Sequence, residues 1–259
     1  MDLGIAGRTA LLAASSDGLG YACARALAAE GVNVTINGRD PDRLARAAES
    51  LSREAKGEVT TVAGDIATED GRDALVEACP APDILLTNNA GPKPKMFLDT
   101  TREDWVETYE GNYLAPIMLI HDVVPGMIAR KFGRIVNITS AMVTAPRPQH
   151  TLSAGARAGL TASLKALSRD VARHNVTINN MLPERIDTGR AHAMLKAATL
   201  RDGVTMEEAR AAAVESIAAR RYGRPEEFGA AFAFLCSAHA GYISGQNLRL
   251  DGGSFPGLV

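Results

Sequence analysis

The sequence predicts one α/β domain, a doubly wound parallel sheet of about seven strands with helices on both faces. Three observations support this prediction. Short apolar segments rich in β-forming residues alternate with longer Ala-rich helical segments along the chain. The 259 residues, 46% of them hydrophobic, suffice for one large core. A Gly-rich turn directly follows the first strand segment, which favours an open sheet over the closed eight-stranded barrel that the alternation also allows.

The strand segments are short and rich in Val, Ile, Leu and Thr, as expected of strands buried in a parallel sheet. The segments between them have helical spacing. After the glycine turn, for example, Leu19, Cys23 and Leu27 fall on one helical face. We place the strands at residues 9–13, 32–37, 58–63, 83–87, 133–139, 175–182 and 247–253.

Residues 190–220 depart from this alternation because they are helical in character throughout. They follow the sixth strand, where a strand end would meet a ligand, so we expect them to form a helical lid within the single domain of residues 1–259. Their apolar side chains either face an apolar substrate or anchor two surface helices, and the sequence leaves both interpretations open. These side chains are Met194, Leu195, Leu200, Val204 and Met206.

Composition and charge argue against several classes of function. The net charge of -2 provides no basic excess for nucleic acid or an anionic membrane surface. No window reaches the roughly 18 apolar residues of a membrane span, and no positive segment precedes the first apolar run. The three cysteines are far apart without metal-binding spacing, which indicates core thiols in a reducing compartment. We expect a cytoplasmic protein without nucleic acid, membrane or metal.

The glycine turn, "AASSDGLG" at residues 13–20, lies between a predicted strand and a predicted helix, where backbone N–H groups bind a pyrophosphate. Here the chain resembles the short-chain dehydrogenase/reductase family, whose fingerprint is TGxxxGxG. The resemblance implies a Rossmann-type fold that binds NAD or NADP. Ala14 occupies the position of the first Gly, and we expect its Cβ to weaken cofactor binding. The implied contacts are Ser15, Ser16, Gly18, Leu19 and Gly20.

The resemblance extends nearly from end to end. The segment GDI matches the adenine-contacting segment after the third strand, TNNAG matches the NNAG motif, and PERIDT resembles the PGxxxT loop that holds the nicotinamide. Near the end, RYGRPEEF and ISGQNLRLDGG match the part that packs at subunit interfaces in the family's tetramers, which implies a homotetramer or a dimer. The further implied cofactor contacts are Asp65, Ile66, Asn89, Ala90, Gly91, Pro183, Ile186 and Thr188.

The end of the second strand distinguishes NADP from NAD, because an Asp there binds the ribose 2'-hydroxyl and an Arg pairs with a 2'-phosphate. The sequence has Gly38 where the Asp would stand, followed by Arg39. This favours NADP. Asp17 in the glycine turn opposes it, because a carboxylate near a phosphate is repulsive. The balance predicts a weak preference for NADP.

The catalytic residues that the resemblance implies are altered. In the family, a Tyr thirteen residues after the catalytic Ser and a Lys four residues later carry the proton chemistry. Counting from Ser140 places Ser153 at the Tyr and Arg157 at the Lys, while Asn112 matches the helical Asn. Because an aliphatic hydroxyl is far less acidic than a phenol, we expect Ser153 to hydrogen-bond the substrate or pass a proton from water. Arg157 keeps the positive charge and is expected to hold the nicotinamide ribose or an acidic substrate.

Three further kinds of side chain near this helix could donate a proton. His150 precedes Ser153 by three residues and titrates near neutrality, so it is the first candidate. Lys93 and Lys95 follow the NNAG turn and are expected to be solvated. Tyr113 adjoins the helical Asn and should face elsewhere, because consecutive helical residues diverge by about 100°.

Three functions remain open. The first is an atypical reductase, similar to 3-oxoacyl-acyl-carrier-protein reductase-like proteins without the standard Tyr and Lys, which acts on a small carbonyl or alcohol with Ser140 orienting the oxygen. The second is a binding or regulatory module that no longer transfers hydride. The third uses the pocket for acid–base chemistry without redox. The retained NNAG, Asn112 and Ser140 favour the first.

Overall fold

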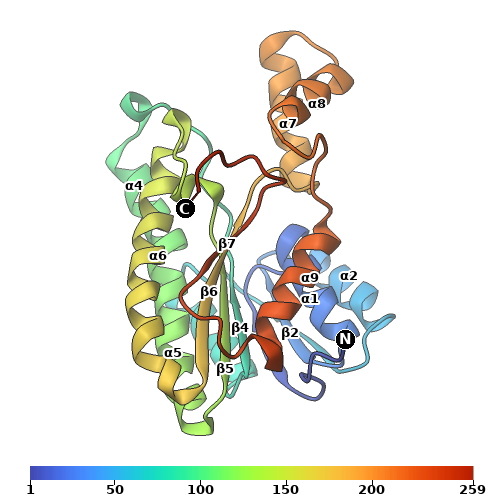
Figure 1. Cartoon of the computed structure of the whole chain (residues 1–259), viewed down its shortest axis with the longest axis vertical. Helices are drawn as coiled ribbons and strands as arrows, with labels where there is room; N and C mark the ends of the chain where they lie inside the picture. The colour runs from blue at the N-terminus through green and yellow to red at the C-terminus, as the bar shows by residue number, and fades with distance from the viewer. Residues whose placement is uncertain (259) are drawn as a thin grey trace.

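The computed structural model describes residues 1–258 and contains a seven-stranded sheet in which neighbouring strands are parallel (Figure 1). The strand order is β3-β2-β1-β4-β5-β6-β7, so the predicted doubly wound α/β fold is confirmed. The strands are β1 (Thr9–Leu12), β2 (Asn33–Gly38), β3 (Val59–Ala63), β4 (Ile84–Thr87), β5 (Gly133–Ile138), β6 (Val176–Pro183) and β7 (Asn247–Leu250).

The strand order reverses direction between β1 and β4. From β1 the chain moves outward to β2 and β3, and then returns to the other side of β1. Ala10 in β1 consequently lies opposite Val34 on one side and Ile84 on the other. The connections that leave β1 and β4 turn to opposite faces of the sheet, which opens a crevice at the carboxyl ends of these strands.

Helices cover both faces of the sheet and bury two apolar cores (Figure 1). One core, around Phe228 and Phe232, lies beneath α1 (Gly18–Ala29), α2 (Pro41–Ser52) and α9 (Pro225–Cys236). The other, around Leu119 and Leu160, lies beneath α3 (Glu69–Ala78), α5 (Ala115–Arg130) and α6 (Thr151–Val171). Because both faces are covered, β4 is buried at every residue and reads Ile-Leu-Leu-Thr without polar alternation.

The predicted strand segments coincide with the observed strands to within a residue at most ends. The largest difference is at the seventh segment, where β7 stops at Leu250 and the chain turns. Gly252 and Gly253 adopt φ values of 61° and 79° there, which strands do not contain. Local apolar patterning therefore located the strands, and the backbone freedom of two glycines shortened the last one.

One helical stretch, Arg102–Arg130, contains an 18-residue window with a mean hydropathy of 1.2 and is long and apolar enough to cross a membrane. The expectation that no such window exists is therefore wrong. The stretch joins α4 (Arg102–Tyr109), a π-helical turn η2 (Glu110–Leu114) and α5. Its Leu119, Ile120 and Met127 belong to the core beneath one face of the sheet. Packing in this fold accounts for its apolar composition.

Helices α7 (Gly189–Asp202) and α8 (Met206–Glu215) extend beyond the rest of the chain at the top of Figure 1. Leu195 is buried against Ala209, Ile217 and Tyr222. It is therefore an anchor, whereas the other four apolar residues predicted here have exposed fractions between 37% and 81%. Those four are Met194, Leu200, Val204 and Met206.

Asp187 connects these two helices at their base. Its carboxylate accepts a hydrogen bond from Arg210 of α8 at 2.7 Å and contacts the Nε2 atom of His192 of α7 at 2.8 Å. The bond from Arg210, followed by the contact with His192, holds the pKa of Asp187 below its ordinary value. The carboxylate therefore stays ionised and keeps α7 and α8 together at neutral pH.

Two local constraints in the fold can be tested. At the crossing of α1 and α9, a Cβ on Gly229 would lie 2.4 Å from the carbonyl oxygen of Ala22, so the close approach requires glycine. In the turn after β1, Ala14 adopts a φ of 45°, in the left-handed region that favours glycine. Position 229 has no room for a methyl group, whereas Ala14 carries one in a strained backbone conformation.

Gly229→Ala is expected to lower the free energy of unfolding by about 1–3 kcal/mol, because the new methyl group forces the two helices apart. Helix propensity alone predicts the opposite sign, a gain of about 1 kcal/mol. Urea denaturation measures the difference. The control is Ala230→Gly at the exposed neighbouring position, which should lose about 1 kcal/mol through propensity. A stabilised Gly229→Ala protein would contradict the close crossing.

Ala14→Gly is expected to raise the free energy of unfolding by about 1 kcal/mol, because it removes the Cβ from a left-handed backbone position. Thermal denaturation measures this change. The control is Ala13→Gly, because Ala13 is fully buried and has no positive φ, and this substitution should destabilise the protein. Destabilisation by both substitutions would show that the turn is not strained.

Candidate active site

The turn after β1 is held from behind by buried side chains. Ser15 is fully buried, and its Oγ donates to the carbonyl oxygen of Leu12 at 2.7 Å and accepts from the backbone N–H of Asn37 at 3.0 Å. The Oδ1 atom of Asn37 accepts from the N–H of Ala14, and Asn88 donates to the carbonyl oxygen of Ala14 at 2.9 Å. The turn is thus clamped between the ends of β2 and β4, with Ser15 supporting it.

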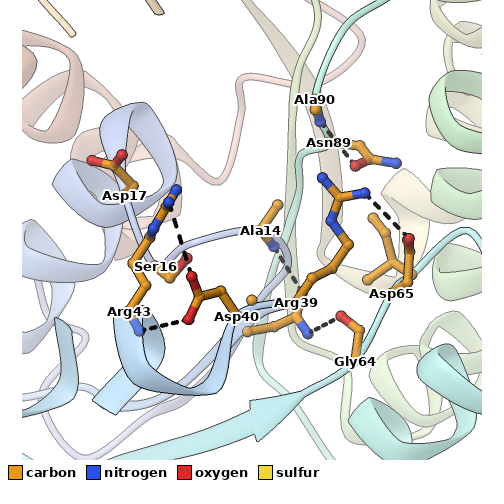
Figure 2. Close-up of a pocket in the computed structure, with 13 residues that line it drawn as sticks. Ala14, Ser16, Asp17, Arg39, Asp40, Arg43, Gly64, Asp65, Asn89 and Ala90 are labelled. Atoms are coloured by element: carbon orange, nitrogen blue, oxygen red, sulfur yellow. Dashed lines mark hydrogen bonds and ion pairs between the residues drawn. The ribbon is translucent and has the colours of Figure 1, made fainter. Parts of the chain in front are cut away.

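A pocket of about 350 Å³ opens at the carboxyl ends of β1, β2 and β3 (Figure 2). Gly38 lets the glycine turn lie close to the end of β2, because a Cβ there would lie 2.6 Å from the Oγ of Ser16. Six predicted cofactor contacts line the pocket: Ser16, Arg39, Asp65, Ile66, Asn89 and Ala90. The structure adds Ala14, Asp17, Asn37, Gly38, Asp40, Arg43 and Gly64.

The charged side chains of this pocket are partly paired with one another. Arg39 lies 3.4 Å from the Oδ2 atom of Asp65, and Arg43 lies 4.0 Å from Asp40. The backbone N–H of Arg43 also holds the pKa of the Asp40 carboxyl below its ordinary value. Asp17 accepts the first N–H of α1 at 2.7 Å, and in Figure 2 Arg43 and Asp40 lie between it and Arg39. Asp17 therefore caps a helix instead of pairing with Arg39.

The other predicted cofactor residues lie outside this pocket at the same edge of the sheet. Gly18, Leu19 and Gly20 form the first turn of α1, and a Cβ on Gly20 would lie 2.4 Å from the carbonyl oxygen of Ala14. Gly20 is therefore required by the close packing of the turn, whatever it binds. Pro183 is the last residue of β6.

The NNAG loop is tied to the π-helical turn η2. Asn89 donates to the carbonyl oxygen of Gly111 at 2.9 Å, and Asn112 donates to that of Ala90 at 3.3 Å. The Oδ1 atom of Asn112 is buried and has no hydrogen-bond partner within residues 1–258. A buried acceptor without a protein partner can accept a hydrogen bond from a water molecule or from a ligand. The π-helical turn, which the sequence did not predict, is of the kind often found at functional sites.

The two predicted catalytic serines belong to adjacent elements. Ser140 follows β5, and its Oγ accepts from the N–H of Met142 at the start of a short 3-10 helix. Ser153 lies in the first turn of α6 and is partly exposed. Because Arg157 follows Ser153 by four positions, they share one face of the helix, as predicted. The hydroxyl of Ser153 has no hydrogen-bond partner in the part of the chain that the structure describes.

Arg157 is buried, with an exposed fraction of 7%, and is bound to backbone. Its Nη1 atom donates to the carbonyl oxygens of Ile138 at 2.6 Å and Thr139 at 3.1 Å, and Nη2 donates to that of Asn89 at 3.3 Å. Burial, and then the charge of Arg190, lower the pKa of Arg157 to about 10, so it is protonated at neutral pH. Three of its five N–H donors serve the protein and two remain.

His150 lies at the start of α6 beside a charged cluster. Glu184 replaces the Gly of the PGxxxT loop and forms an ion pair with Arg147. Burial, followed by the charges of Arg147 and Arg190, lowers the pKa of His150. The ring is therefore neutral at pH 7, which weakens its case as the proton donor. Its Nδ1 atom is buried without a partner among the described residues.

The remaining candidate proton donors are paired, exposed or distant from Ser153. Lys95 pairs with Asp104 at 2.6 Å, and Lys93 is exposed. The hydroxyl of Tyr113 is 3.0 Å from that of Ser163, about 15 Å further along the axis of α6 than Ser153. These side chains are therefore unsuited to donate a proton beside Ser153.

The loop after β6 meets the NNAG loop. Ile186 is buried, and Thr188 caps the N-terminus of α7. Two residues later, Arg190 donates to the carbonyl oxygens of Gly91 at 3.1 Å and Pro92 at 3.2 Å. The predicted cofactor residues Ile186, Thr188 and Gly91 are thus brought to one place by a side chain that the sequence analysis did not select.

Arg43 and Arg190 were missed from sequence, although each carries a signal. Both stand in the first turn of a helix, α2 and α7 respectively. A cation there opposes the positive end of the helix dipole, where acidic residues are usual. Once the helix starts at Pro41 and Gly189 are placed, each misplaced arginine indicates an anion nearby. Within residues 1–258, no group of three His, Cys, Asp or Glu side chains is arranged to hold a metal ion.

The chain is similar over nearly its whole length to known reductases. A family model described as enoyl-(acyl carrier protein) reductase matches residues 13–254. The chain is 30% identical to NADPH-dependent reductase BacG of Bacillus subtilis over 256 residues, covering 97% of this chain and 99% of that protein. It is 28% identical to 3-oxoacyl-[acyl-carrier-protein] reductase FabG of Vibrio cholerae, covering 98% and 99%.

Among solved structures, L-sorbose reductase from Gluconobacter frateurii, complexed with NADPH and L-sorbose, superposes with a TM-score of 0.95. It is 31% identical in sequence, and the match covers 100% of both chains. The fold of the whole described chain therefore has a counterpart in a known reductase. The chain belongs to the short-chain dehydrogenase/reductase family.

Proposed function

We propose that this protein is an NADP-dependent oxidoreductase that reduces a small carbonyl compound at an atypical site. The observation that carries the proposal is the pocket at the carboxyl ends of β1, β2 and β3, lined by Arg39 directly after β2 and by Arg43 in the first turn of α2. An NADPH-dependent reductase and a reductase solved with NADPH are among the similar proteins, which supports the same cofactor here. Carbonyl reduction, including that of 3-oxoacyl groups, is the activity named for several relatives.

The charges around the pocket favour NADP over NAD. At the end of β2, Gly38 provides no carboxylate for a ribose 2'-hydroxyl, while Arg39 and Arg43 provide two cations for a 2'-phosphate. Asp17, which opposed NADP in the sequence, is engaged at the start of α1. A phosphate would compete with Asp65 for Arg39, whose present contact of 3.4 Å is long and largely exposed.

The residues beside the nicotinamide position hold and orient the reactants. When bound, the cofactor supplies a hydride to the carbonyl carbon. Asn112, with an unpartnered buried oxygen, and Arg157, with two unused donors, are placed to bind polar groups of the cofactor or the substrate. Ser140, at the end of β5, donates a hydrogen bond to the carbonyl oxygen and orients it.

The proton for the carbonyl oxygen comes from water in this proposal. The oxygen of Ser153 is set back by the length that a Tyr ring would span, and its hydroxyl has no protein partner in the described chain. A water molecule bound to Ser153 bridges this gap and passes its proton to the carbonyl oxygen as the hydride adds. The hydroxide that remains takes a proton from the solvent, to which Ser153 is partly exposed. The nearby charge of Arg157 stabilises the negative charge that develops there.

A catalytically silent binding module is the second candidate, because Arg157 spends three donors on main-chain carbonyls and Ser153 is a poor acid. Under this alternative the pocket binds its ligand without hydride transfer. Non-redox acid–base chemistry remains the third candidate, and neutral His150 would then serve as a base.

The lid and the assembly complete the proposal. We assign residues 1–259 to a single domain, in which α7 and α8 act as a lid whose exposed Met194 and Met206 face the substrate or the solvent. A homotetramer in the cytoplasm is proposed from the family resemblance. Exposed apolar side chains on two separate regions support self-association. On α4–α5 these are Val106, Tyr109, Leu114 and Met118, and near the sheet edge they are Phe234 and Leu248.

Arg39→Ala is expected to raise the Kd for NADPH about tenfold or more and to leave the Kd for NADH nearly unchanged, because it removes a charged contact to the 2'-phosphate. Calorimetric titration of the parent and the variant with each cofactor measures this. Arg53→Ala, at the other end of α2 and outside the pocket, is the control. If the parent binds neither cofactor, the proposed function is wrong. Equal loss of NADH binding would exclude a 2'-phosphate role.

The double substitution Ser153→Tyr with Arg157→Lys tests the proton route. Because the native route runs through water and Ser153, we expect the parent to oxidise NADPH with at least one carbonyl substrate. The doubly substituted protein should be equally or less active with that substrate. The assay uses a panel of ketones, ketoses and 3-oxoacyl thioesters. Circular dichroism and NADPH binding serve as controls for folding, since Lys cannot replace all three backbone contacts of Arg157.

The opposite result would favour the silent module. If the parent reduces no carbonyl in the panel while the doubly substituted protein does, the parent is not a reductase for that substrate. The single substitution Ser153→Tyr distinguishes the effect of position 153 on activity from that of position 157, because it introduces the phenol and leaves the backbone contacts of Arg157 intact.

A further inference from the structure

Two guanidinium groups converge on one point beside the predicted nicotinamide site. A Cβ built on Gly91 would lie 3.3 Å from the Nη2 atom of Arg190 and 3.6 Å from the Nη2 atom of Arg157. Both Nη2 atoms therefore lie within contact distance of one point next to the backbone of Gly91. Each Nη2 atom donates one N–H to a main-chain carbonyl, to Pro92 and Asn89 respectively, which leaves a second N–H on each.

Neither arginine has a carboxylate partner. No ion pair joins Arg157 or Arg190 to an acidic side chain within residues 1–258. The charged neighbour that acts on Arg157 is Arg190, and its effect is repulsive. The nearby acids are engaged elsewhere, since Glu184 pairs with Arg147 and Asp187 pairs with Arg210.

The position of Arg190 adds to this positive potential. It stands in the first turn of α7, where the helix dipole is positive and a cation is unfavourable. Buried polar atoms around the start of α6 also have no partner in the described chain, namely the Nδ1 of His150 and the Oγ1 of Thr151. Two like charges, a helix N-terminus and unpartnered polar atoms together form an environment that an anion would stabilise.

We propose that Arg157 and Arg190 bind a carboxylate of the substrate, so that the substrate is an oxo acid. This inference rests on the proposed carbonyl reduction and specifies its substrate class. The site lies close to the reacting group, because Arg157 is bonded to the carbonyl oxygen of Thr139 and Ser140 is the next residue. In a substrate whose carboxylate is one or two carbons from the carbonyl carbon, the carboxylate can bind the two arginines while the carbonyl oxygen binds Ser140. Guanidinium groups match the planar geometry of a carboxylate.

The test compares an oxo acid with an uncharged analogue of similar shape. Acetoacetate and acetoacetamide form one pair, and 2-oxobutanoate and 2-oxobutanamide form another. We expect kcat/KM to be higher for the acid of at least one pair. Arg190→Gln should lower kcat/KM for that acid by roughly 10- to 100-fold, with little effect on the amide. Arg190→Lys should recover part of the loss, because it keeps the charge.

The control variant is Arg201→Gln at the opposite end of α7, where Arg201 is paired with Asp202. It should leave the acid-to-amide ratio unchanged. A loss of packing in α7 would lower kcat/KM for the acid and for the amide alike. The acid-to-amide ratio therefore distinguishes a loss of carboxylate binding from a loss of structure. A second readout is independent of turnover. Calorimetry in the presence of NADPH should show that oxamate binds to the parent and binds more weakly to Arg190→Gln. Uncharged oxamide should bind to neither protein.

Several outcomes would overturn the inference. If Arg190→Gln weakens NADPH binding and leaves the acid-to-amide ratio intact, the pair binds the cofactor's diphosphate. If ketones bearing a phosphate show the dependence on Arg190 and oxo acids do not, the carboxylate assignment is wrong. If the parent binds NADPH and reduces both members of each pair equally, the proposed carbonyl reduction is supported and the assignment of an oxo acid as substrate is wrong. If it binds no cofactor, the proposed function itself has failed.

Discussion

The buried guanidinium of Arg157 is the interaction on which the rest of the site depends. Removing a cation from water costs several kcal/mol, and no carboxylate compensates for it here. Three hydrogen bonds to carbonyl oxygens offset this cost. Those oxygens belong to Ile138 and Thr139 at the end of β5 and to Asn89 after β4. A single side chain of α6 thereby sets the positions of two central strand ends.

Other side chains extend this connection across the crevice. Asn89 and Asn112 join the loop after β4 to the π-helical turn, and Asn88 joins it to Ala14 in the glycine turn. The turn in turn rests on Asn37 of β2. The loops that carry the predicted site residues are therefore held by the neutral side-chain amides of asparagines and by the charged guanidinium of Arg157. The strained φ of Ala14 is tolerated because both its N–H and its carbonyl are bound in this way.

The altered dyad separates two tasks that the family resemblance assigns to neighbouring residues. Positive charge is retained and more firmly anchored, because the planar group of Arg157 spans three backbone carbonyls where an ammonium presents a single nitrogen. Acidity is lost, because Ser153 lacks a phenol. In the proposed mechanism the orientation of the carbonyl comes from a rigid scaffold, while the proton comes from water. The proposed lid, formed by α7 and α8 with exposed Met194 and Met206, would be the adaptable part of that site.

The strands, the glycine turn and the placement of Ser153 and Arg157 on one helical face were predictable, because each depends on spacing within a short stretch of chain. The partners of these residues were not. Arg157 bonds to Asn89, which is 68 positions away in the chain, and Arg190 bonds to Gly91 at a separation of 99. The ion pair of Glu184 with Arg147 also joins residues far apart in the chain. The positive φ of Ala14 could not be read from its residue type, because alanine rarely adopts that conformation. Apolar periodicity specifies which face of an element is buried, but charge pairing and burial depend on which distant segments meet, and the packing of the two cores on the sheet decides that.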